Sequence, residues 1–111
     1  MRERDIEAHL VRRVKELGGE VRKVQWVGRA SAPDRLVMLP ERMVFLNQNS
    51  NFHDFAPAVT AWVELKNPKT IVTFPADARE RAQAREHERM RKLGQRVEVI
   101  GTIEQVEELL A

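Results

Sequence analysis

Apolar side chains near the start of the chain recur at the spacing of a helix. If residues 3–17 are helical, one face of that helix carries Ile6, Leu10, Val14 and Leu17, since 3.6 residues complete each turn. Gly18 follows directly, and glycine readily takes the left-handed backbone conformation that ends a helix. The sequence therefore predicts an amphipathic first helix.

Shorter apolar runs, bounded by glycine, proline or asparagine, predict strands further along. The predicted strands are 20–27, 35–39, 43–46, 59–66 and 96–100. Pro40 and Glu41 separate the second strand from the third, so 43–46 is expected to return as the second arm of a hairpin. The stretch 47–54 is polar and has no period, which predicts a loop.

Two helices complete the predicted order. A long helix is expected over 75–93, ended by Gly94, and a capping-box pattern at Thr102 opens a short C-terminal helix. A strand at 59–66, a crossover helix and a strand at 96–100 imply one parallel pair. The expected fold class is therefore α/β.

Length and composition fit one soluble domain without disulfides. The chain has 111 residues and a mass of 12.9 kDa, enough for a single modest core, so residues 1–111 are expected to form one domain. No apolar run approaches the roughly 20 residues that cross a bilayer, and the N-terminus lacks the apolar stretch of a signal peptide. There is no cysteine, which excludes disulfides, thiolate zinc sites and cysteine nucleophiles. A cytoplasmic location with no membrane partner is expected.

The charge of the chain leaves its partner open. The net charge is only +2, although the isoelectric point is about 9.4. If several acids gather at a metal, the remaining surface is more basic than this total suggests, which is compatible with a phosphate backbone. The long helix mixes arginine with glutamate, a pattern more typical of a solvated face than of a DNA-binding one.

Two short motifs contain the residue types that metal-dependent phosphodiester hydrolysis needs. Residues 32–35, Ala-Pro-Asp-Arg, place an aspartate at a turn, and residues 62–66, Trp-Val-Glu-Leu-Lys, place a glutamate and a lysine on one strand. Side chains two apart on a strand share a face. Mg²⁺ typically takes one or two carboxylates, and an ammonium group beside it orients water or stabilises the transition state. The candidate metal ligands are Asp34, Glu64 and the Leu65 carbonyl, with Lys66 as the catalytic cation.

Each motif also has an ordinary structural explanation. Pro-Asp is a common turn dipeptide, and Glu-x-Lys on an exposed strand face is a common ion pair. Their conjunction within one predicted α/β order favours the functional interpretation. The histidines lack zinc-ligand spacing; His87 is expected on the helix surface and His53 in a loop.

The motifs and their flanking elements resemble the small standalone VRR-NUC nucleases of the PD-(D/E)xK superfamily. The resemblance covers nearly the whole chain and rests on Glu7, 31–37, 63–66, Gln83 with 86–88, and 93–97. The family's restriction-endonuclease-like core has the order α-β-β-β-α-β, which fits the predicted order. In this chain the core would contain a mixed sheet and would be followed by a C-terminal helix.

The resemblance implies roles for six residues. Asp34, Glu64 and the Leu65 carbonyl would hold Mg²⁺ or Mn²⁺, and Lys66 would be the catalytic lysine. Glu7 would be a helix-borne carboxylate that supports the metal or its water, and Gln83 would steady the site or a DNA phosphate. Without the resemblance, neither residue stands out. An acid on a helix face, such as Glu7, is usually solvated, and Gln83 could equally be an exposed helix residue.

The chain departs from the family pattern in two places. Ala32 stands where the family often has glycine, a change that should not abolish metal binding. The separation of Asp34 from Glu64 is longer than the family pattern suggests. The excess falls in residues 47–58, which are expected to be a loop insertion that contacts DNA or a second subunit, or that is inert.

The function that the resemblance implies is a divalent-metal-dependent endodeoxyribonuclease of bacterial or phage origin. Standalone members resemble Holliday-junction resolvases, and a twofold homodimer presents two sites suited to two symmetric incisions in branched DNA. The alternatives are a flap, nick or duplex nuclease of phage-type replication or repair, and a catalytically silent DNA-binding module. The presence of Asp34, Glu64 and Lys66 together argues against silence.

Overall fold

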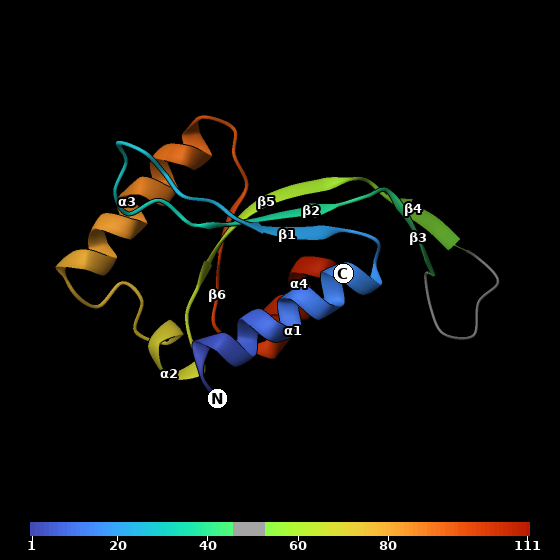
Figure 1. Cartoon of the computed structure of the whole chain (residues 1–111), viewed down its shortest axis with the longest axis horizontal. Coiled ribbons are helices and arrows are strands. Elements are labelled where there is room, and N and C mark those ends of the chain that lie inside the picture. Colours follow the sequence, from blue (N-terminus) through green and yellow to red (C-terminus); the bar gives the residue numbers. More distant parts are fainter. Residues whose placement is uncertain (46–52) are drawn as a thin grey trace.

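The computed structural model describes residues 1–45 and 53–111 and forms a mixed α/β fold (Figure 1). Its elements follow the order α1 (Glu3–Glu16), β1 (Glu20–Lys23), β2 (Arg35–Leu39), β3 (Arg42–Phe45), β4 (His53–Ala56), β5 (Val59–Leu65), α2 (Pro68–Ile71), α3 (Ala78–Lys92), β6 (Val97–Ile100) and α4 (Ile103–Leu110). Within the described residues, no helix combines the length and apolar character needed to cross a membrane.

A four-stranded sheet in the order β1-β2-β5-β6 organises the molecule. β1 and β2 are antiparallel, as are β2 and β5, whereas β5 and β6 are parallel. The parallel pair follows from the crossover through α3, which returns the chain to the same edge in the same direction. The α/β class, the mixed sheet and the C-terminal helix expected from the sequence are thereby confirmed.

One face of this sheet is covered by α1 and α4, which lie side by side in Figure 1. The first helix buries Ile6, Leu10 and Val14 against this face. β5 contributes alternate residues to the same core, and α4 closes it with Val106, Leu109 and Leu110. The apolar periodicity of the first helix therefore predicted the core face correctly.

The helix ends agree with local sequence signals. Gly18 and Gly94, just beyond α1 and α3, have φ angles of +85° and +88°, the left-handed conformation that glycine adopts without a steric penalty. α3 begins three residues later than expected, because Asp77 caps it by accepting a hydrogen bond from the Glu80 backbone N–H at 2.8 Å. Thr102 caps α4 in the same way, as expected.

The predicted hairpin between 35–39 and 43–46 is wrong. β2 already pairs with β1 on one edge and β5 on the other, so no edge remains for a third partner. β3 instead pairs with β4 in a separate antiparallel ribbon, which lies at the end of the molecule away from α3 (Figure 1). The expected loop and insertion at 47–58 therefore contains strand β4, and its residues 47–52 lie outside the described part.

The strand expected over 20–27 is shorter than predicted. β1 ends at Lys23, although the Val24 N–H still donates to the Asp34 carbonyl at 2.8 Å. Beyond this bond, residues 25–33 leave the sheet and pass beside α3 (Figure 1). This departure positions the Pro33-Asp34 turn at the start of β2.

Candidate active site

The candidate site lies on the face of β5 opposite the apolar core. Ala61, Val63 and Leu65 point into the core and are at most 4% exposed. The intervening side chains of Glu64 and Lys66 contact α3 instead. The alternation of a strand thus separates the hydrophobic core from a polar layer under α3. Leu65 leaves only its backbone to contribute to that layer.

Lys66 is buried, and α3 supplies its partners. Its Nζ donates to the Gln83 Oε1 at 2.9 Å and lies 3.0 Å from the Glu80 Oε2. The ammonium also lies 5.1 Å from the centroid of the Phe74 ring. A buried ammonium is tolerated when it is paired and hydrogen-bonded in this way. The structure therefore brings together Lys66 and Gln83, two of the residues predicted for the site.

Glu80 is the negative partner of this lysine. Its other oxygen accepts a hydrogen bond from the Ala76 N–H at 2.9 Å. That backbone bond, followed by the bond from the Lys66 ammonium, holds the pKa of Glu80 below its ordinary value. Glu80 is consequently a carboxylate at neutral pH and fixes the ammonium on the α3 side of the site.

Glu64 contacts a buried histidine of the same helix. The His87 Nε2 lies 3.2 Å from the Glu64 Oε1, and the His87 side chain is only 1% exposed. Its ring stacks on Phe74 with centroids 6.0 Å apart. The expectation that His87 lies on the helix surface is therefore wrong, because the face of α3 that contains His87 covers the polar side of β5.

Asp34 lies beside Glu64 across the sheet. Arg35 pairs with Val63, and one further step of this antiparallel register sets Asp34 opposite Glu64. The Asp34 carboxylate is bound at 2.8 Å by Arg35, and its side chain is 48% exposed. The backbone positions of the two predicted ligands are thus neighbours across the sheet, although Asp34 and Glu64 are 30 residues apart in the sequence.

Glu7 is linked to Asp34 through Arg35. Its carboxylate accepts from the Arg35 Nε at 2.7 Å, and the same guanidinium binds Asp34. Arg35 therefore stands between Glu7 and Asp34, and a cation at Asp34 would have to compete with it. Glu7 is placed to hold Arg35, a contact that the sequence did not suggest.

The donor set fits a hard divalent cation held by few protein ligands. Within residues 1–45 and 53–111, no group of three or more histidine, cysteine, aspartate or glutamate side chains is arranged to hold a metal. Mg²⁺ commonly uses only one or two protein carboxylates and completes its coordination shell with water and phosphate. The carboxylates of Asp34 and Glu64 are therefore of the right type and number for this ion. A site of this composition would be completed largely by its substrate.

The sequence analysis did not identify two residues of the site, Glu80 and His87. Glu80 and His87 lie three residues before and four after Gln83, so all three share one face of a helix. All three are at most 8% exposed. Treating Gln83 as a member of a polar helical face, and not as a single residue, would have found both.

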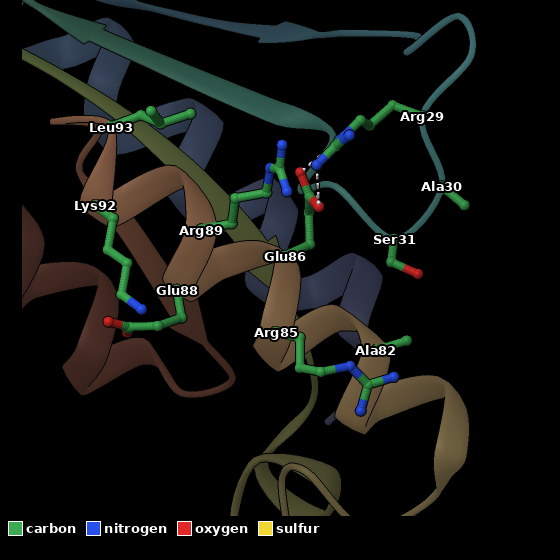
Figure 2. Close-up of a pocket in the computed structure, with 10 residues that line it drawn as sticks. All are labelled: Arg29, Ala30, Ser31, Ala82, Arg85, Glu86, Glu88, Arg89, Lys92 and Leu93. Carbon is green, nitrogen blue, oxygen red and sulfur yellow. Dashed lines mark hydrogen bonds and ion pairs between the residues drawn. The ribbon is translucent and has the colours of Figure 1, made fainter.

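A loop contact ties the Asp34 turn to α3. The Arg29 Nε and Nη2 donate to the two oxygens of Glu86 at 2.8 and 2.9 Å (Figure 2). The bond from Arg29 lowers the pKa of Glu86. A two-point guanidinium–carboxylate pair fixes orientation as well as distance, so the loop before Asp34 is held against the helix that carries Gln83.

Comparison with known proteins places this geometry in a family. No family model matches the chain, and no curated protein matches it at a significant level. Among solved structures, the chain is similar to one described as a VRR_NUC domain. The identity is 33%, the match covers 97% of this chain and 92% of that one, and the TM-score is 0.66. With this identity over nearly the full length of both chains, the protein belongs to the VRR-NUC domain family.

Proposed function

We propose that this protein is a divalent-metal-dependent endodeoxyribonuclease that acts as one domain over residues 1–111, inside the cell. The observation that supports this most strongly is the shared polar face of β5. There, Glu64 lies opposite Asp34 by register, and Lys66 follows two residues later. Membership of a nuclease-type family makes phosphodiester hydrolysis the reaction to which this arrangement is best suited.

The roles of the side chains follow from their chemistry. Asp34, Glu64 and the Leu65 carbonyl would hold Mg²⁺ or Mn²⁺, which when bound supplies a more acidic water and positive charge at the reacting phosphate. Lys66, held by Glu80 and Gln83, offers an ammonium group to the developing negative charge. Glu7 acts through Arg35, and His87 orients Glu64. Gln83 positions Lys66.

The finer proposal is a homodimer that cleaves branched DNA as a Holliday-junction resolvase. Resolution of a four-way junction requires two incisions related by twofold symmetry, and each copy of this chain offers one site. The alternatives are nucleases that act on flaps, nicks or plain duplex. Light scattering gives a direct test of the dimer, since a mass near that of one chain at working concentration would exclude it.

A cleavage assay tests the proposed reaction. End-labelled four-way junction, flap, nicked and intact duplex DNA are incubated with Mg²⁺, Mn²⁺ or a chelator, beside the variant Glu64→Ala. We expect metal-dependent cuts by the wild type and none by the variant. Paired cuts confined to the junction support the resolvase, and cuts elsewhere support the alternatives. Binding of DNA without cleavage of any substrate would overturn the proposed enzyme.

A further inference from the structure

A groove of about 740 Å³ runs between α3 and the loop that precedes Asp34 (Figure 2). Its cations from α3 are Arg85, Arg89 and Lys92. These residues follow the spacing i, i+4, i+7 and therefore lie along one side of the helix. Within the described part of the chain, no hydrogen bond or ion pair engages their charged groups. The groove thus has a row of cations that no described group binds through a hydrogen bond or ion pair, although the charge of Arg89 acts on the nearby Glu86 carboxylate.

The acids of the groove do not cancel this row. Glu86 is already paired with Arg29 through two hydrogen bonds, and Glu88 is the other acid of the lining. Glu88 in turn forms an ion pair with Arg91 at 3.8 Å, so the row of three cations suits a ligand with regularly spaced negative charges. The phosphates of a nucleic-acid strand have this arrangement.

A second hollow of about 380 Å³ continues the groove. It shares Arg29, Glu86, Arg89 and Leu93 with the first and is lined in addition by both tryptophans, Trp26 and Trp62. The two indole rings lie with centroids 5.0 Å apart at an angle of 45°. Aromatic surface beside a basic groove is the combination by which proteins bind unpaired strands, because bases stack on the rings.

Both tryptophan rings are fixed by hydrogen bonds through their N–H groups. Trp26 donates to the Pro33 carbonyl at 2.8 Å, and Trp62 donates to the Gln95 Oε1 at 3.0 Å. These bonds satisfy the polar edge of each ring and leave its apolar surface available to the hollow. A ligand base would meet a preformed surface, which reduces the entropic cost of binding.

The hollow is close to the candidate active site. Trp62 precedes Glu64 by two residues on the same face of β5, a separation of about 7 Å along a strand. Trp26 is bonded to the residue directly before Asp34. A base held by the tryptophans would therefore lie near the phosphate that the site acts on.

We propose that these two hollows bind one unpaired DNA strand beside the cleavage site. Its phosphates lie along Arg85, Arg89 and Lys92, and one base stacks against the Trp26–Trp62 pair. Bases within a duplex are already stacked on their neighbours, so this surface selects a strand that is single or splayed at a branch. The inference rests on the proposed function, since it names the form of DNA which that nuclease recognises.

Intrinsic fluorescence directly tests the proposed stacking of a base on the tryptophans. The chain has two tryptophans and no tyrosine, so its indole emission comes from the proposed contact alone. The protein is titrated with oligothymidylate and with blunt duplex of equal length, in chelator to prevent cleavage. We expect oligothymidylate to quench the emission and to bind about ten-fold more tightly than the duplex, the order of effect that base stacking produces.

Matched variants test the proposed binding of phosphates along α3. The variant R85Q/R89Q/K92Q should weaken oligothymidylate binding and reduce the slope of log K against log salt by roughly 2, since each lost phosphate contact contributes about 0.7. The control R4Q/R12Q/K15Q removes the same charge from exposed positions of α1 and should leave the slope unchanged. Trp62→Leu should weaken binding about ten-fold, whereas Val11→Ala, which removes a partly exposed aliphatic side chain from α1, outside both hollows, should not.

The outcomes separate this inference from the proposed function. Absence of quenching, equal affinity for duplex, or equal slopes for the two triple variants would overturn the inference, even if the enzyme cleaves DNA with metal. Quenching and a reduced slope without metal-dependent cleavage would support the inference and overturn the proposed enzyme.

Discussion

The two faces of the four-stranded sheet are built from different kinds of side chain. The face beneath α1 and α4 is aliphatic, and its cluster includes Leu10, Val37 and Val63, each without exposed surface. The face beneath α3 buries Lys66, Glu80, Gln83 and His87, whose polar atoms bind one another or Glu64. Burial on the first face stabilises the fold, whereas burial on the second fixes the orientation of polar groups.

This division has a physical reason. Removing aliphatic surface from water is favourable without directional requirements, so the first face accepts any well-packed set of apolar residues. A buried charge is tolerated only with partners at defined distances. The polar face therefore tolerates fewer combinations of side chains than the aliphatic face. Substitutions on the polar face should mainly affect activity, and substitutions on the aliphatic face should mainly affect stability.

The largest expected effect is the loss of catalysis when the ammonium of the polar face is removed. Lys66→Ala should reduce the cleavage rate by about 10² to 10³-fold, the usual consequence of deleting one group that stabilises transition-state charge. DNA binding should largely persist, because binding depends on many phosphate contacts. Single-turnover cleavage and anisotropy measure the two quantities, with Lys69→Ala on α2 as an exposed-lysine control. Equal cleavage by Lys66→Ala and wild type would remove this lysine from the mechanism.

The next largest effect is a loss of stability from the aliphatic face. Leu10→Ala should lower the free energy of unfolding by about 2–5 kcal/mol, because the side chain is fully buried and its removal leaves a cavity. Urea unfolding measures this change. Val11→Ala, at a neighbouring position that is 43% exposed, should change stability by less than about 0.5 kcal/mol. Similar losses for both variants would contradict the assignment of the core face.

A smaller effect is expected where α3 begins. Asp77→Ala removes the side chain that caps this helix and should lower the free energy of unfolding by about 1 kcal/mol. Asp77→Asn keeps an accepting oxygen and should restore most of the loss. If the cap also aligns the polar face, Asp77→Ala will weaken Mg²⁺ binding, measured by calorimetry, more than Asp77→Asn does.

The smallest expected effect is a change in acid sensitivity. Because the pKa of Glu80 is lowered in the folded protein, its stabilising contribution is present above about pH 4.3, the ordinary value for glutamate. That contribution is lost as the pH falls through the lower folded value. Urea midpoints measured from pH 7 to pH 3 should fall less steeply for Glu80→Gln than for the wild type. Parallel curves would show that Glu80 does not gain its partners on folding.

Only part of the polar face was foreseen from local pattern. Strand alternation placed Glu64 and Lys66 on one face, whereas the role of Gln83 was implied by the family resemblance and not by its helical position. The contacts of His87 and Glu80 escaped prediction, since a helix with alternating charges normally faces solvent. Their burial follows from α3 lying over a strand whose outer face is itself polar.

The ribbon of β3 and β4 shows the opposite situation. Local pattern identified a strand near 43–46 correctly, but not its partner. Pairing depends on which strand edges other segments have already occupied, and the edges of β2 were taken by β1 and β5. No local pattern contains that information.

The sequence by itself determined the α/β class, the apolar face of the first helix, the shared face of Glu64 and Lys66, and the motifs of the family resemblance. These features depend on periodicity and on neighbours within a few residues, where backbone geometry is uniform. Only the tertiary structure decided that Arg35 joins Asp34 to Glu7, that His87 meets Glu64, and that Trp26 and Trp62 share a hollow with the cations of α3. Such contacts join residues far apart in the chain, so their distances are set by how the sheet and α3 pack.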